Sequence, residues 1–225
     1  MATPNTTPNT TPLAVTVVSD VICPWCWLGK ARLERGAAES GVPLAITWRP
    51  FELNPDMPAS GMERAAYRAA KMGKERSDAL DAEMIRLGAD EGLAFRFDRQ
   101  ARTPNTRKAH MLIAFAGASG RDHALAQSLF EAYFHEGADL ADDVVLIERA
   151  AAAGLDPDQA RLAIADAELS ALVGREEAQA QALGITGVPF FILDERYGVS
   201  GAQPAEVWRE ALPEIAAKRE GGGAA

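Results

Sequence analysis

Apolar side chains follow different patterns along the 225 residues, and these patterns divide the chain. Leu13 to Val18 is a β-branched run that is typical of a buried strand. Residues 27–40 carry apolar side chains every four to five positions and stop before Gly41, which indicates a helix. Leu44 to Trp48 is a second strand. Together these elements predict a βαβ unit with parallel strands.

The period becomes helical from residue 62 to residue 183. Thr103-Pro104, Asp122, Asp142 and Asp156-Pro157 are typical helix starts. We expect about five to seven helices here, with core stripes at residues three to four apart. Three stripes stand out: Leu80, Met84 and Leu87; Leu125, Leu129, Ala132 and Tyr133; and Leu169, Leu172, Val173 and Leu183.

Strand patterns return after Gly184. Residues 188–193 and 199–200 read as strands, and residues 204–218 read as a last helix. The predicted order is therefore βαβ, a helical insertion, then ββα, which is an α/β fold. Residues 13–61 and 184–219 would form one domain in two halves, 62–183 the insertion, and 1–12 a disordered tail.

Charge excludes several classes of partner. The chain has 23 basic and 32 acidic residues, a net charge of −9, and no basic cluster along its length. Nucleic acids and anionic membranes are therefore not expected as partners. The N-terminus lacks the features of a secretory signal, and no apolar run is long enough to span a membrane. We expect a cytoplasmic protein, in which two cysteines are more plausibly a working redox pair than a structural disulfide.

The two cysteines, Cys23 and Cys26, stand two residues apart where the first strand meets the first helix. Free N–H groups and partial positive charge at a helix start favour a thiolate. Cys23 is therefore the predicted nucleophile. Cys26, one turn further, is expected to stay protonated until it resolves a mixed disulfide on Cys23. Pro24 suits the first helical position.

The pair has two other interpretations. Half of a zinc site would need further ligands, but there is no second cysteine pair, and His110, His123 and His135 show no metal spacing. No metal site is therefore expected. The other alternative is two inert core cysteines.

The segment Gly187-Val188-Pro189 places a proline at a strand start. Pro189 could simply mark an edge strand or the beginning of a strand. Alternatively, a cis Val188–Pro189 bond could turn the Val188 backbone towards the thiols, where it could pair with a substrate peptide.

Four motifs together resemble the DsbA family of thioredoxin-fold oxidoreductases, and most closely its FrnE-like branch. They are SDVICPWCWLG at 19–29, PNTRKAH at 104–110, GITGVPFF at 184–191 and GVSGAQP at 198–204. The resemblance implies a thioredoxin-like fold with a helical insertion over residues 62–183. It also implies that Cys23 is the nucleophile, Cys26 the resolving thiol and Pro189 a cis-proline that faces them.

The sequence departs from the pattern of some relatives. Some FrnE-like proteins carry a second cysteine pair, so a relay between two pairs is not expected here. The related 2-hydroxychromene-2-carboxylate isomerases and kappa-class glutathione transferases generally have serine at the position of Cys23.

Further candidate cleft residues come from the insertion and from aromatic side chains. Asn105 and His110 could face Cys23, or could be a helix cap and a core histidine; Thr106 shares a helical face with His110. We expect Trp25, Trp27 and Phe51 to form an apolar rim for a substrate.

The expected function is thiol–disulfide exchange through Cys23 and Cys26, without a bound cofactor. Protein thiols or disulfides, or glutathione as a co-substrate, are the expected partners, in a monomer or a homodimer. Two alternatives stay open. One is a glutathione-dependent isomerase or transferase. The other is a redox-inert chaperone or binding module.

Overall fold

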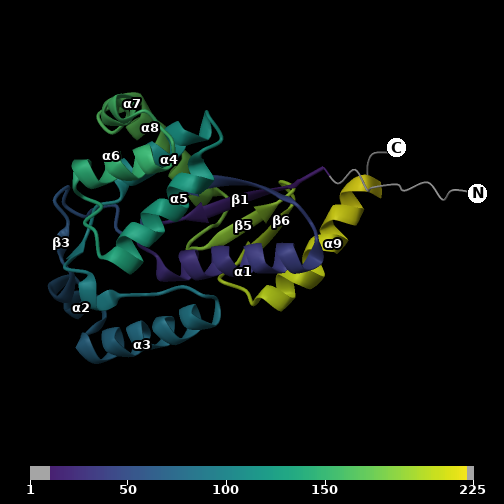
Figure 1. The fold of residues 1–225 in the computed structure, drawn as a ribbon, viewed down its shortest axis with the longest axis horizontal. Coiled ribbons are helices and arrows are strands. Elements are labelled where there is room, and N and C mark those ends of the chain that lie inside the picture. Colours follow the sequence, from purple (N-terminus) through teal and green to yellow (C-terminus); the bar gives the residue numbers. More distant parts are fainter. Residues whose placement is uncertain (1–10, 222–225) are drawn as a thin grey trace, which may run out of the picture.

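A four-stranded sheet forms the centre of the protein in the computed structural model, which describes residues 11–221 (Figure 1). The strands are β1 (Leu13–Ser19), β2 (Leu44–Pro50), β5 (Phe190–Leu193) and β6 (Tyr197–Ser200). Their order is β2-β1-β5-β6, with β1 and β2 parallel and the other pairs antiparallel. This is the predicted thioredoxin-like topology. Most of the predicted disordered tail, residues 1–10, lies outside the described residues, as do residues 222–225.

Two helices pack together against the sheet: α1 (Pro24–Ser40) and α9 (Ala205–Gly221). Helix α1 has Pro24 in its first turn and ends at Gly41, whose φ of 72° suits glycine. Gly36 allows α9 to approach closely, because a Cβ at this position would lie 2.4 Å from the Cβ of Trp208. The ring of Trp208 is fully buried and packs edge-on against Phe191 of β5.

The insertion between β2 and β5 is helical, as predicted, and lies above and to the left of the sheet in Figure 1. It begins with α2 (Arg64–Met72) and α3 (Lys74–Asp90), which lie beside the start of α1. A 3₁₀ turn (Phe97–Arg99) and five further helices follow: α4 (Arg107–Gly117), α5 (Asp122–Phe130), α6 (Asp143–Ala152), α7 (Pro157–Ala163) and α8 (Ala167–Ala182).

The structure corrects details of the expected insertion. A two-stranded ladder pairs β3 (Met62–Glu63) with β4 (Arg102–Thr103), so the insertion is not entirely helical. Leu183, expected in a core stripe, is 72% exposed because α8 ends one residue before it. Asp142 and Asp156 cap helices as expected, whereas the helix after Thr103-Pro104 begins only at Arg107.

Helix α5 continues into a π-helical turn, η2 (Glu131–Glu136). Several of its carbonyls accept hydrogen bonds from outside the helix, and His135 O is one of them, with Arg99 Nη1 as its donor at 3.3 Å. Arg96 N donates to Phe134 O at 2.7 Å, and Gln100 Nε2 donates to Tyr133 O at 2.9 Å. Such turns are rare and need local compensation. Phe134 of this turn stacks on Trp27 in the first turns of α1, with 5.7 Å between the ring centroids.

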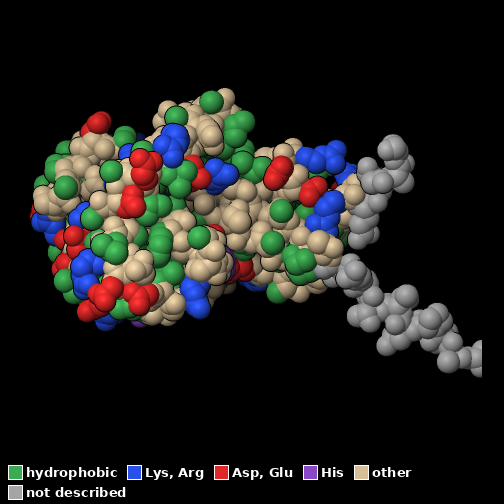
Figure 2. Space-filling model, turned by 90° about the horizontal axis from the view of Figure 1, so that it is seen from above, with side chains coloured by type: hydrophobic (Ala, Val, Ile, Leu, Met, Phe, Trp, Pro, Cys, Tyr) green, Lys and Arg blue, Asp and Glu red, His purple; other side chains and the backbone are tan. Residues whose placement is uncertain are grey.

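Acidic and basic side chains are interspersed on the face shown in Figure 2, and no large area of one sign is visible there. Within the described residues, no helix has both the length and the apolar character needed to cross a membrane.

The contact at Gly36 gives a prediction about stability. Gly36→Ala should lower the free energy of unfolding by about 1–3 kcal/mol, because the new methyl group forces α1 and α9 apart. Gly174→Ala in α8 is the matched control, since its Cβ would meet only Arg107 Nη1, at 3.6 Å. This control should be neutral or stabilising by up to about 1 kcal/mol. Urea unfolding of both variants measures the difference; equal effects would contradict the tight packing of α1 on α9.

Candidate active site

Cys23 is the residue that caps the N-terminus of α1. Its backbone is extended (φ −88°, ψ 112°), and its carbonyl accepts from Cys26 N at 3.0 Å, which begins the helix. No acidic side chain occupies the first turn of α1. Cys23 therefore lies at the N-terminal, positive end of the α1 dipole. Both cysteines are free thiols.

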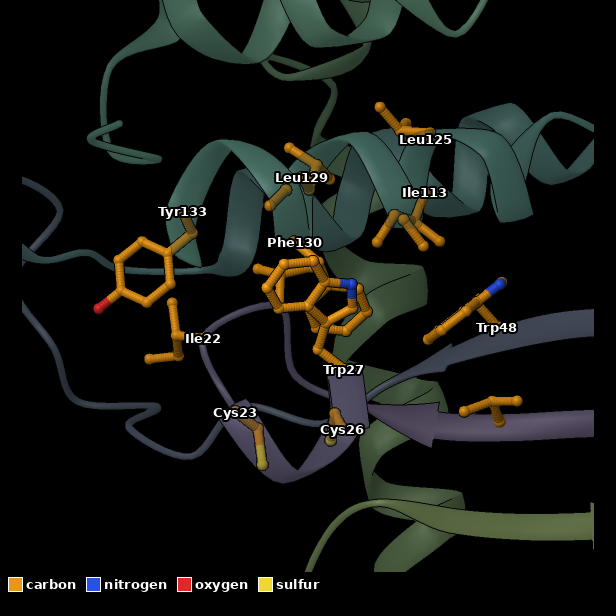
Figure 3. Packing of buried hydrophobic residues seen from close by; sticks show 14 of the residues in the cluster. Ile22, Cys23, Cys26, Trp27, Trp48, Ile113, Leu125, Leu129, Phe130 and Tyr133 are labelled. Carbon is orange, nitrogen blue, oxygen red and sulfur yellow. The ribbon is translucent and has the colours of Figure 1, made fainter. Parts of the chain in front are cut away.

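Cys26 lies one turn further along α1 and is fully buried in the core. Burial is the main cause that raises the pKa of this thiol well above its ordinary value, and the neighbouring Cys23 adds to the shift. Figure 3 shows the two sulfurs at the start of α1. The pair is thus asymmetric, with one thiol at the wall of a cavity and one thiol behind it.

The loop before β5 completes the surroundings of Cys23. The Val188–Pro189 peptide bond is cis, as the second interpretation of this segment expected. The Cys23 thiol donates to the Val188 carbonyl oxygen, with 3.7 Å between sulfur and oxygen. The edge-strand interpretation is wrong, because β5 lies between β1 and β6.

A cavity of about 280 Å³ opens beside Cys23. The start of α1 supplies one wall with Cys23, Pro24 and Trp25, and Val188 borders it from the cis-proline loop. Helices α2 and α3 of the insertion form the opposite wall. Phe134 and Tyr133 of the π-helical turn also line the cavity, and burial raises the pKa of Tyr133.

The residues of α2 that line the cavity were not among the site residues predicted from the sequence. Arg64, Arg68 and Lys71 all line the cavity, with Tyr67 between them. Their spacing of four and three residues puts them on one helical face, which is the signal that could have found them. The expectation that no basic cluster exists is therefore wrong at this wall.

Two of the expected rim residues lie elsewhere. Trp27 is only 3% exposed, and its ring stacks on Phe130 and Phe134 at centroid distances of 6.4 and 5.7 Å. Figure 3 shows the ring against Phe130, with the Cys23 sulfur turned away from both. Phe51 packs with Ala180 and other residues of a separate apolar cluster. Only Trp25 lines the cavity as expected.

Asn105 and His110 do not line the cavity either. Asn105 accepts from Arg107 N at 3.0 Å and donates to Met57 O at 2.8 Å, so it stabilises the approach to α4. His110 is 3% exposed, and its Nε2 lies 3.4 Å from Asp20 Oδ1. His110 is a core histidine, as the alternative interpretation expected. Asn105 is not the helix cap, because it lies one residue before the N-cap, Thr106.

Asp20 connects this buried histidine to the cysteine segment. Its carbonyl accepts from Cys23 N at 3.0 Å, and its carboxylate accepts from Leu53 N at 2.8 Å. Next to Leu53, the buried Glu52 pairs with Arg107 at 2.5 Å. Arg107 also lies 3.3 Å from Glu177 of α8. Burial and then repulsion from Glu177 raise the pKa of Glu52 to about 7.

No group of three or more His, Cys, Asp and Glu side chains is placed to hold a metal ion in the part of the chain that the structure describes. The site therefore consists of two thiols, a backbone carbonyl and the cavity between α1 and the insertion.

A family model for the DsbA-like thioredoxin domain matches residues 14–213. The chain belongs to the DsbA-like thioredoxin family. The crystal structure of a probable DsbA oxidoreductase, SCO1869 from Streptomyces coelicolor, is 37% identical with a TM-score of 0.82, over 92% of this chain and 91% of that one. The uncharacterized protein YwbO of Bacillus subtilis is 28% identical over 91% of this chain and 98% of its own length.

The family fold extends to more distant proteins. The cytosolic disulfide reductase DsbM from Pseudomonas aeruginosa, solved with GSH, has a TM-score of 0.65 and 22% identity, over 90% of this chain and 98% of that one. At this identity the likeness concerns the fold. Membership in the family supports an oxidoreductase.

The different environments of the two thiols predict different rates of alkylation. In the reduced, folded protein at pH 7, iodoacetamide should label Cys23 at least about ten times faster than Cys26, because Cys26 is buried and its pKa is raised. Peptide mapping by mass spectrometry after timed quenching measures both rates. In denaturant the two rates should become similar, which is the control. Faster labelling of Cys26 in the folded state would reverse the roles.

The raised pKa of Glu52 predicts a pH dependence of stability. The folded state holds the proton more tightly than the unfolded state does, so ionisation of Glu52 opposes folding. This cost is absent below about pH 4.5 and fully present above about pH 7. As the pH rises from 5 to 8, the free energy of unfolding of Glu52→Gln should therefore increase relative to that of the wild type by roughly 1–3 kcal/mol.

Chemical denaturation at several pH values tests this expectation. The exposed Glu148→Gln in α6 is the matched control, and its difference from the wild type should change much less with pH. A constant difference for Glu52→Gln across the range would contradict a buried, proton-binding Glu52.

Proposed function

We propose that this protein is a thiol–disulfide oxidoreductase of the FrnE-like type that acts through Cys23 and Cys26. The observation that carries the proposal is the arrangement of the pair: Cys23 at the helix start beside a cavity and the Val188 carbonyl, with Cys26 buried one turn behind it. A nucleophile and a resolving thiol need these two different environments.

The reaction proceeds in two exchanges. The Cys23 thiolate attacks one sulfur of a substrate disulfide, the substrate S–S bond breaks, and the first substrate thiol leaves with a proton. Cys26 then loses its proton and attacks Cys23, which forms the Cys23–Cys26 disulfide and releases the second substrate thiol. Two electrons pass from the protein to the substrate. The same steps in reverse oxidise a dithiol substrate.

The buried Cys26 suits the second exchange. Its raised pKa keeps it protonated while Cys23 is free, which protects it from external disulfides. Once Cys23 carries a mixed disulfide, Cys26 lies one helical turn from the sulfur that it must attack. Neither step needs a bound cofactor, and glutathione could serve as the external thiol, as the complex of DsbM with GSH suggests. We place this exchange in the cytoplasm, the location of the structurally similar disulfide reductase DsbM.

Single-cysteine variants test the mechanism. Purified, reduced Cys26→Ser should accumulate a mixed disulfide on Cys23 when it is incubated with bis(2-hydroxyethyl) disulfide, because nothing resolves the adduct. Cys23→Ser should form at least about tenfold less adduct, since Cys26 is buried. The wild type should end as the intramolecular disulfide. Intact mass spectrometry distinguishes the three products.

The same variants separate the alternatives. A glutathione-dependent isomerase or transferase should keep its activity in Cys26→Ser, because that reaction needs no resolving thiol. A redox-inert binding module should give no adduct in either variant. Equal adduct formation by both single-cysteine variants would overturn the proposed division of roles.

A further inference from the structure

The resolving thiol, Cys26, has to ionise in surroundings that oppose charge. It is fully buried, and the second exchange begins when this thiol loses its proton. Burial, followed by the neighbouring Cys23, raises the pKa of Cys26 well above its ordinary value. A thiolate at this position therefore needs hydrogen-bond donors from the protein, since solvent does not reach the sulfur.

The end of β1 supplies two such donors. Burial raises the pKa of the Cys26 thiol, and the Ser19 hydroxyl and the backbone N–H of Asp20 act against this effect as hydrogen-bond donors. Ser19 is the last residue of β1 and follows Val15 and Val17 on the strand face that packs into the same core as Cys26. In Figure 3 the end of this strand lies beside Cys26.

The hydroxyl of Ser19 is not satisfied while both cysteines are free thiols. Ser19 is only 3% exposed, and its Oγ is buried without a hydrogen-bond partner among the described residues. A buried hydroxyl in this state costs stability. A neutral thiol is a weak acceptor, whereas hydrogen bonds to an ionised acceptor are roughly twice as strong. The hydroxyl is thus placed for a bond that becomes favourable when Cys26 is charged.

The carboxylate next to Ser19 has other partners. Asp20 Oδ2 accepts from Leu53 N at 2.8 Å, and Asp20 Oδ1 lies 3.4 Å from His110 Nε2. Asp20 therefore offers the sulfur its backbone N–H, and Ser19 offers its side chain. A neutral hydroxyl suits this position because it attracts a thiolate, whereas a carboxylate would repel it.

We propose that Ser19 is a further catalytic residue, whose hydroxyl, together with the Asp20 N–H, donates to the Cys26 thiolate as it forms and attacks Cys23. The attack forms the Cys23–Cys26 bond and breaks the bond between Cys23 and the substrate sulfur. The substrate thiolate that leaves takes up a proton, which balances the one that Cys26 lost. This inference rests on the proposed thiol–disulfide exchange and adds a residue to its second step.

Single-turnover oxidation of the reduced protein separates the two steps. With excess bis(2-hydroxyethyl) disulfide, acid quenching at timed intervals and intact mass spectrometry give two rates: formation of the mixed disulfide on Cys23, and its resolution by Cys26. Ser19→Ala should slow resolution about five- to thirtyfold, because a hydrogen bond to a charged sulfur is lost. Formation of the mixed disulfide should change less than about twofold, since Cys26 stays protonated in that step.

Thr16→Val is the matched control. It removes a hydroxyl from the opposite face of the same strand, where Thr16 Oγ1 lies 3.3 Å from Thr47 Oγ1. This variant should leave both rates unchanged. Urea unfolding of the reduced proteins tests for a merely structural role. Ser19→Ala should be at least as stable as the wild type, because it removes a buried hydroxyl that has no partner among the described residues.

The outcomes separate this inference from the proposed function. The role of Ser19 is wrong, and thiol–disulfide exchange stands, if the wild type forms the Cys23–Cys26 disulfide and Ser19→Ala resolves equally fast. The same conclusion follows if Ser19→Ala slows both steps equally, or slows resolution only together with a loss of stability. If the wild type forms neither the mixed nor the intramolecular disulfide, the exchange function itself is overturned, and the role of Ser19 with it.

Discussion

The site depends on the burial of the Trp27 ring between α1 and the insertion. This ring meets Phe95 edge-on at 5.0 Å and stacks on Phe134 at 5.7 Å. Trp27 belongs to the same first turns of α1 as the cysteines, and Phe134 also lines the cavity. One aromatic cluster therefore fixes the helix start relative to the insertion that covers it. Aromatic pairs add about 0.5–1.5 kcal/mol each beyond burial, so the cavity is held by packing rather than by flexible surface contacts.

The difference between the two thiols follows from their positions on one helix. Cys23 has extended backbone before the first turn and faces a cavity, whereas Cys26 has helical backbone and faces the core. The low polarity around Cys26 raises its pKa, and no acidic side chain in the first turn of α1 opposes the helix dipole at Cys23. The strand–helix junction alone thus produces the asymmetry that thiol exchange requires.

The sequence predicted what is encoded locally. β1, α1, β2 and the helix end at Gly41 follow from apolar periodicity and from one glycine with positive φ. The prediction was wrong where orientation depends on segments distant in sequence. Trp27 looked like a rim residue because its partners lie about a hundred residues away in the sequence. Phe130 ends α5, and Phe134 belongs to a π-helical turn that no local sequence pattern predicts. The basic face of α2 was visible in the spacing, but its meaning depends on how α2 folds over Cys23.

The charge of the cavity can differ in sign from that of the whole protein because screening is short-ranged. At physiological ionic strength the Debye length is about 8 Å, so most of the net negative charge has little effect inside the cavity. Lys71 and the arginines of α2 act at contact distance, where the low-dielectric wall strengthens their field. An acidic protein can therefore present a locally cationic pocket beside Cys23. The insertion then has two physical roles: it limits access to Cys23 by covering the helix start, and it sets the charge that an entering molecule meets.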